Sequence, residues 1–169
     1  MKEGSSPVCH RTVCVGKLPG ALFYAWTRRR VSERLSRLMP TEVVELPDEK
    51  EPANPSPALN EAVMRKEGEA ILRHIPPKAY VIALCIEGRQ LSSEAVAAKL
   101  ERSCHAGKVI SSLLLLSEGR WGCIPSVTAR ADLKLSMSSM TFPHQLARVM
   151  LLEQLFRAAK INAGERYHK

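Results

Sequence analysis

Residues 80–86 read YVIALCI and residues 113–116 read LLLL, and glycines that signal turns follow both runs at Gly88 and Gly119. Continuous apolar runs of this length are typical of strands that are covered on both faces of a sheet. Between the two runs, Ser92, Ser93 and Glu94 form an N-terminal cap signal for a helix that extends to residue 100. A strand, a helix and a strand in this order predict a right-handed parallel crossover.

Six further elements continue this pattern on both sides of the crossover. Each of them carries apolar residues at helical or strand-like spacing, and Pro47 ends an alternating run that is typical of a half-buried edge strand. The expected strands are 12–15, 42–47 and 133–137, and the expected helices are 21–38, 59–75 and 143–161. The pattern predicts an α/β protein with a parallel sheet flanked by helices, and a chain of 169 residues favours one domain.

Ligands of parallel α/β sheets bind at the carboxyl ends of the strands. In this chain the segments that follow the apolar strands are 84–88, 117–122 and 137–142. The last segment combines small hydroxyl side chains with methionine, and Pro143 is tolerated in the first turn of the helix behind it. We therefore expect this loop to direct free amides and the positive end of the helix towards a ligand.

The final helix has an apolar surface wider than one stripe. Apolar residues recur at intervals of three and four, and the 151–152 pair widens the surface beyond one stripe. The recurring residues are Leu146, Val149, Met150, Leu155, Phe156 and Ala159. This width indicates a helix that is buried on two sides. A dimer interface is slightly favoured, and a central helix in the core of one subunit is the alternative.

The net charge of +8 is unevenly distributed along the chain. Residues 1–40 carry +6, residues 41–69 carry −5 and residues 70–169 carry +7. Two basic regions favour a polyanionic partner such as nucleic acid over a merely soluble basic surface, because binding phosphates releases counterions. The arginines at 28, 29, 30, 34 and 37 form a stripe that fits phosphate binding or a solvated helix face equally well.

The five cysteines are widely spaced and include no C-x-x-C pair, so neither a metal site nor a disulfide framework is expected. Cys85 lies in an apolar run, where a free thiol behaves as a small hydrophobic side chain. The sequence has no apolar stretch long enough to span a bilayer and no hydrophobic signal core at its start. We expect no membrane association and a cytoplasmic protein.

Several motifs together resemble the SPOUT-class ribosomal RNA large subunit methyltransferase H family. The most specific motifs are the loop MTFPHQ at 140–145 and the terminal YHK at 167–169. The weaker ones are VGKL at 15–18, EVVELPDEK at 42–50, KEGE at 66–69 and LSSE at 91–94. They occur in order from about residue 12 to the end. The resemblance therefore indicates one SPOUT methyltransferase domain at 12–169 and an N-terminal extension at 1–11.

The resemblance implies a deep trefoil knot on the C-terminal side and a homodimer with sites at its interface. It implies S-adenosylmethionine as the cofactor, bound in the knot. The implied reaction is methylation of N3 of a pseudouridine in 23S ribosomal RNA, at the family position 1915, in the 70S ribosome.

The same resemblance assigns roles to individual residues. The implied catalytic residues are His168, as the proton acceptor or orienting group, Tyr167, which would stack on or hydrogen-bond the base, and Arg148. A frayed terminus is the alternative reading of the Tyr-His pair, and an interface salt bridge is the alternative for Arg148. The implied cofactor-binding residues are Leu84, Glu118, Gly119, Met137, Ser138, Ser139, Met140, Thr141 and Phe142.

The chain departs from the family pattern at the turn after residue 116. Glu118 stands in the Ile-Gly-Gly position of the family, Trp121 replaces a small or polar residue, and Cys85 replaces an acidic one. Glycine permits close approach of the backbone to a cofactor, whereas glutamate adds bulk and a charge that is costly to bury. We hypothesise a cofactor affinity below the family norm. An active methyltransferase is favoured because the 140–145 loop and the tail are retained, and the alternative is a weakened or inactive homologue that binds ribosomal RNA without turnover.

Overall fold

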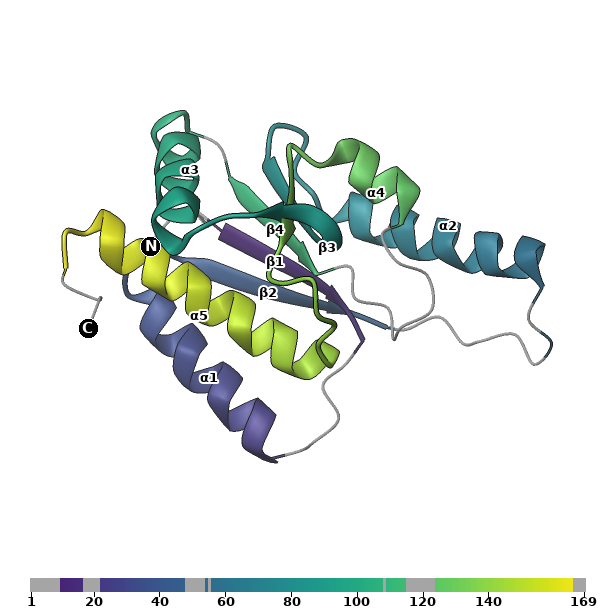
Figure 1. The fold of residues 1–169 in the computed structure, drawn as a ribbon, viewed down its shortest axis with the longest axis horizontal. Helices are drawn as coiled ribbons and strands as arrows, with labels where there is room; N and C mark the ends of the chain where they lie inside the picture. The colour runs from purple at the N-terminus through teal and green to yellow at the C-terminus, as the bar shows by residue number, and fades with distance from the viewer. Residues whose placement is uncertain are drawn as a thin grey trace, which may run out of the picture.

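The computed structural model describes residues 10–16, 22–47, 54, 56–107, 109–114 and 124–165, except for the side chains of 22–28, 112–114 and 144. Its five strands form one sheet in the order β2-β1-β4-β3-β5, and every neighbouring pair is parallel (Figure 1). The parallel crossover and the edge position of the second strand are confirmed. The strands are β1 (His10–Val15), β2 (Thr41–Leu46), β3 (Tyr80–Gln90), β4 (Ile110–Leu114) and β5 (Leu133–Ser136).

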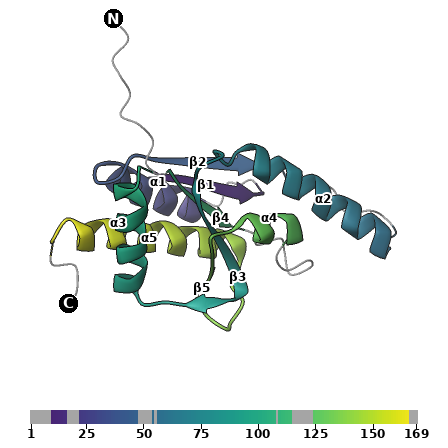
Figure 2. The same cartoon turned by 90° about the horizontal axis from the view of Figure 1, so that it is seen from above.

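Helices cover both faces of the sheet, which gives three layers (Figures 1 and 2). One face is buried by α1, α3 and α5, and the other by α2 and α4, so each face has its own apolar core. This arrangement explains why the central strands read as continuous apolar runs. The helices are α1 (Leu22–Ser36), α2 (Pro57–Arg73), α3 (Ser93–His105), α4 (Pro125–Arg130) and α5 (His144–Asn162).

Local sequence signals set the beginnings of two helices. The Ser92 hydroxyl accepts a hydrogen bond from the amide of Ala95 at 3.2 Å, which confirms the predicted cap of α3. Ser56 caps α2 in the same way, through the amide of Leu59 at 3.3 Å. Each cap satisfies one of the amides that the first turn of a helix leaves without a partner.

Two features of the fold differ from the sequence prediction. Gly88 does not form a turn, because β3 continues through it to Gln90. The six-residue helix α4 was not expected, and it packs Val127 against the core on the α2 side of the sheet. The span of α4 is too short for an apolar period to be recognised.

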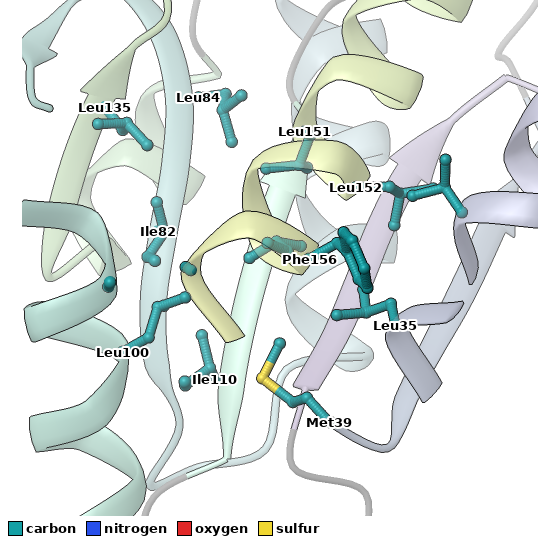
Figure 3. Close-up of a cluster of buried hydrophobic side chains, with 14 of the residues drawn as sticks. Leu35, Met39, Ile82, Leu84, Leu100, Ile110, Leu135, Leu151, Leu152 and Phe156 are labelled. Atoms are coloured by element: carbon teal, nitrogen blue, oxygen red, sulfur yellow. The ribbon is translucent and has the colours of Figure 1, made fainter. Parts of the chain in front are cut away.

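The apolar width of α5 is accounted for inside one subunit (Figure 3). Leu151, Leu152, Leu155 and Phe156 are all buried, in a cluster that includes residues of α1, α3 and the central strands. The preference for a dimer interface as the reason for this width was therefore wrong, because α1 and α3 cover the two sides of the helix. The outward flank of α5 keeps some apolar surface, since Leu146 is 36% exposed.

The first strand begins at His10, inside the range expected for the N-terminal extension. His10 pairs with Thr41 of β2 and Ile110 of β4 and is completely buried. Burial lowers the pKa of its imidazole to about 3, because desolvation penalises the charged form. Between about pH 3 and pH 6.5 the folded protein therefore keeps His10 neutral, whereas the unfolded chain protonates it.

Acidification is therefore expected to destabilise the fold through His10. In the unfolded state the His10 imidazole binds a proton below its pKa of 6.5, whereas in the folded state it stays neutral down to about pH 3. The contribution of His10 to the free energy of unfolding is therefore fully present above pH 6.5 and falls as the pH decreases towards 3. The expected loss at pH 5 is about 2 kcal/mol relative to pH 8. Urea denaturation of wild type and His10→Gln at both pH values measures it. His105→Gln, at the exposed end of α3, is the control. An equal pH dependence in wild type and His10→Gln would contradict the assignment.

Cys14 and Cys85 are buried, and Cys104 is exposed. Within the part of the chain that the structure describes, no three His, Cys, Asp or Glu side chains gather in a way that would hold a metal ion. No described helix has the length and apolar character needed to cross a membrane.

Candidate cofactor site at the carboxyl edge of the sheet

The carboxyl ends of β3, β4 and β5 meet at one edge, because the three strands are parallel neighbours. Leu84 of β3 pairs with Leu114 of β4 and with Leu135 of β5, and its side chain is buried. This predicted cofactor residue therefore lies between the ends of both neighbouring strands. Glu118 and Gly119, which were expected to complete the edge after β4, lie outside the described residues.

Residues 137–143 follow β5 at this edge, and we call them the cofactor loop. The Ser136 hydroxyl donates to the carbonyl of Ser138 at 2.9 Å, and the Ser138 hydroxyl accepts from the amide of Met140 at 3.1 Å. Hydroxyl-to-backbone bonds of this kind hold a short loop in one conformation without regular secondary structure. The hydroxyls of Ser136 and Ser138 therefore help to fix the conformation of the loop.

The side chains of the cofactor loop divide into two groups. Met137 and Phe142 are partly buried and pack against the core. Ser139, Met140 and Thr141 are exposed, and Met140 is 67% exposed. The loop therefore combines two apolar anchors with an accessible stretch of small hydroxyls and a flexible thioether. A site of this type suits a ligand with an apolar ring and polar edges.

The helix α5 begins directly behind the cofactor loop. Pro143 is its N-cap residue, one position before the first turn where it was expected, and no side chain caps the helix. The Pro143 carbonyl accepts the first helical bond from the amide of Ala147 at 2.9 Å. The first-turn amides therefore have no side-chain acceptor, and the positive end of the helix dipole lies beside the loop.

A close contact between β3 and β5 fixes the start of the cofactor loop. The register of this pair shifts between Leu84 and Arg89, so β3 bulges before it rejoins β5. A Cβ atom added to Gly88 would lie 2.5 Å from the carbonyl carbon of Leu135 and 2.7 Å from the amide nitrogen of Ser136. Only glycine allows the two backbones to approach this closely.

Arg148 lies on α5, one turn after its start, and is only 2% exposed. Its Nη1 donates to Glu45 Oε1 at 2.9 Å, and its Nη2 donates to the carbonyls of Val15 at 3.3 Å and Gly16 at 3.0 Å. The guanidinium thus joins α5 to the ends of β1 and β2 within one subunit. Whether it also takes part in the chemistry stays a prediction.

Comparison with known proteins shows what this fold and loop are related to. The family described as "Predicted SPOUT methyltransferase" matches residues 10–168. A protein of Bifidobacterium animalis subsp. lactis (strain AD011), named ribosomal RNA large subunit methyltransferase H, is 47% identical over 160 residues, which cover 93% of this chain and 97% of that protein. This chain belongs to the ribosomal RNA large subunit methyltransferase H family of SPOUT proteins.

Two other relatives carry the same name. The protein of Bifidobacterium adolescentis (strain ATCC 15703 / DSM 20083 / NCTC 11814 / E194a) is 51% identical over 138 residues, which cover 82% of this chain and 86% of that protein. The protein of Clostridium novyi (strain NT) is 46% identical over 157 residues, which cover 93% of this chain and 97% of that protein. The similarity therefore includes both the sheet and the cofactor loop of this family member.

The predicted catalytic residues Tyr167 and His168 lie outside the described residues of this SPOUT protein. The described chain ends just after α5, where Gly164 adopts a φ of 70° and the amide of Glu165 donates to the carbonyl of Lys160 at 3.1 Å. A left-handed glycine followed by this bond is a common helix end. The start of the tail is thus held at the end of α5 opposite the cofactor loop.

Arg29 and Arg34 of the α1 arginine stripe have structural partners. Arg29 pairs with Glu33 at 2.8 Å, and the guanidinium of Arg34 lies 4.4 Å from the centre of the Phe156 ring. The latter distance is typical of a cation–π contact. These two arginines help to hold α1 and its contact with α5, and phosphate binding by the stripe stays a prediction.

Two residues of the site were not identified from the sequence. Gly88 was interpreted as a turn signal, although an isolated glycine next to an apolar strand also signals a close backbone approach. Glu45 was interpreted only as a polar position of an edge strand. No sequence signal links Glu45 to Arg148, because the two are 103 residues apart.

Proposed function

We propose that this protein is an S-adenosylmethionine-dependent methyltransferase that modifies N3 of a pseudouridine in 23S ribosomal RNA within the 70S ribosome. The observation that carries the proposal is the cofactor loop, held beside Leu84 at the carboxyl edge of a SPOUT-family sheet. The relatives named ribosomal RNA large subunit methyltransferase H support the RNA substrate. We expect the protein to act in the cytoplasm, because assembled ribosomes are its proposed substrate.

The described residues fit the proposed cofactor. Leu84, Met137 and Phe142 supply apolar contacts for an adenine, and the backbone of the cofactor loop supplies donors and acceptors for its edge. S-adenosylmethionine would supply an activated methyl group on a sulfonium. We propose that Ser138, Ser139, Met140 and Thr141 complete the binding site, together with Glu118 and Gly119. The trefoil knot implied by the family resemblance remains a prediction.

The reaction requires that the nucleophilic N3 loses its proton and is aligned with the methyl group. His168 is the proposed proton acceptor or orienting group, because an imidazole exchanges protons near neutral pH. Tyr167 is proposed to stack on the base or to hydrogen-bond it. Both side chains must then reach the cofactor loop of an active site.

The reach of the tail supports a homodimer. The amide of Glu165 is bonded to the carbonyl of Lys160, and from there back to His144 the helix extends over about 24 Å. The three residues from Glu165 to His168 span about 11 Å at most. His168 therefore falls well short of the cofactor loop of its own subunit. We propose that the tail of each subunit completes the site of its partner.

Methyl transfer to ribosomes tests the proposed function. The purified protein is incubated with labelled S-adenosylmethionine and 70S ribosomes from a methyltransferase-deficient strain, and the modified nucleoside is identified by mass spectrometry. The expected product is N3-methylpseudouridine in 23S RNA, and its formation should depend on His168 and Tyr167. Ribosome binding without transfer would instead support the inactive homologue. Modification of a different base would overturn the proposed substrate.

The variant Glu118→Gly is expected to bind S-adenosylmethionine about 10-fold more tightly than wild type, because it removes bulk and a charge from the turn facing the cofactor. Isothermal titration calorimetry of the two proteins measures the difference. Glu101→Gln, at an exposed position of α3, controls for the change in net charge. Equal affinities of wild type and Glu118→Gly would rule out the hypothesis that Glu118 weakens cofactor binding.

A further inference from the structure

The ion pair between Glu45 and Arg148 is well enclosed by the protein. The Arg148 side chain is 2% exposed and the Glu45 side chain is 25% exposed, and their atoms are 2.9 Å apart. By contrast, Arg11 of β1 and Glu42 of β2 pair at 2.7 Å, with 28% and 44% of their side chains exposed. Two glutamates of β2 thus each pair with an arginine, and the pair at Glu45 is buried more deeply than the pair at Glu42.

The guanidinium of Arg148 is committed to partners inside the subunit. Nη1 binds Glu45, and Nη2 binds the carbonyls of Val15 and Gly16. A further donor, Nε, is buried and has no hydrogen-bond acceptor. A guanidinium enclosed in this way does not reach an RNA phosphate while these bonds persist. The contacts therefore point to a role in holding other parts of the site.

Arg148 connects two regions that are distant in the sheet. It lies on α5, five residues after Pro143 at the end of the cofactor loop. Its partners lie at the ends of β1 and β2, whereas the cofactor loop begins at β5 on the opposite edge of the sheet. The backbone contact at Gly88 fixes the beginning of the loop, and the Arg148 contacts fix the helix into which the loop leads. The cofactor loop is thus held at both ends.

We propose that Glu45 and Arg148 are positioning residues that hold the cofactor loop in its binding conformation. The inference rests on the proposed function, since it concerns the same cofactor site. The position of Glu45 requires a carboxylate, because burying the Arg148 cation without a neighbouring anion costs free energy. The structure around Arg148 can lower that cost by shifting so that the guanidinium reaches other partners or water. We expect the first turn of α5 to shift in response, and the cofactor loop to shift with it.

The decisive comparison is between Glu45→Gln and Glu42→Gln. Both variants remove one negative charge from β2 without changing side-chain size, but only the first acts on the enclosed pair. We expect the dissociation constant for S-adenosylmethionine to increase by about 10-fold to 100-fold in Glu45→Gln and to stay within about 2-fold of wild type in Glu42→Gln. Calorimetry is performed well below the unfolding midpoint of every variant. A merely structural role would lower that midpoint and leave the dissociation constant unchanged, which would overturn the proposal.

Hydrogen exchange of the cofactor-free protein provides a second measurement. Amides of the cofactor loop and of the first turn of α5 are expected to exchange faster in Glu45→Gln than in Glu42→Gln, while β3 and β4 exchange equally in both. Should Glu45→Gln fail to fold, Glu45→Asp serves in its place, because it keeps the charge but withdraws it from Arg148 by one methylene. Unchanged loop exchange in these variants would also contradict the proposal.

These two measurements separate the inference from the proposed function. If wild type binds S-adenosylmethionine and Glu45→Gln binds it equally well, the positioning role is wrong and the proposed function stands. If wild type binds no S-adenosylmethionine, the proposed function fails, and the exchange experiment still decides whether the pair holds the loop.

Discussion

The substitution Gly88→Ala is expected to destabilise the protein by about 3 kcal/mol or more and to abolish cofactor binding. An added Cβ would lie within 2.8 Å of three backbone atoms of Leu135 and Ser136. Backbone atoms in a paired strand cannot rotate away as the end of a flexible side chain can. The strands β3 and β5 would have to separate where the cofactor loop begins. Urea denaturation measures the loss of stability, and calorimetry with S-adenosylmethionine measures the loss of binding.

Gly107→Ala is the matched control for this experiment. Gly107 has a φ of 66°, so alanine is strained there, but nothing lies within 4 Å of the added Cβ. The expected cost is about 1 kcal/mol, from backbone conformation alone, with cofactor binding unchanged. If Gly88→Ala proved no more destabilising than Gly107→Ala, the close approach of β3 to β5 would be wrong.

The variant His168→Ala is expected to lower the rate of methyl transfer by about 100-fold or more, and a second defective variant should restore activity to it. The second variant, Ser138→Arg, blocks the cofactor loop but keeps an intact tail. If the tail acts in the partner subunit, a heterodimer of the two contains one complete site. Random reassembly of equal amounts should then give about a quarter of wild-type activity.

A double variant with both changes in one chain makes the test stringent. Mixed with wild type, it forms heterodimers that contain no complete site if the tail acts in the partner. If the tail acts in its own subunit, the wild-type chain of each heterodimer keeps a complete site. In that case the mixture of single variants would stay inactive, and the proposed composite site would be wrong.

Much of the fold was predictable because its signals are local. The apolar runs at 80–86 and 113–116 identified two inner strands of the sheet, of which the second is described as far as Leu114, and Ser92 identified the start of α3 through its own hydrogen bond. The alternation before Pro47 identified an edge strand, which the sheet order confirms. These features depend on neighbours within a few residues, which sequence spacing records directly.

The candidate site was only partly predictable. Residues 137–142 stood out because a loop of small hydroxyls and methionine follows a strand, and Leu84, at the end of its strand, was assigned through the family resemblance. The apolar face of α5 was misinterpreted, because periodicity shows how much surface is buried but not which element buries it. The same limit applies to Arg148, whose partners come from β1 and β2, more than 100 residues earlier.

The sequence by itself determined the order of every element except α4, the parallel α/β class, the family and the loop that carries the candidate site. Only the tertiary structure decided that Gly88 is a point of backbone contact, that α5 is covered within its own subunit, and that Arg148 is paired with Glu45. The physical reason is the range of the interactions. Hydrophobic periodicity and helix caps act between near neighbours in the chain, whereas packing distances and enclosed ion pairs arise only when the sheet brings distant segments together.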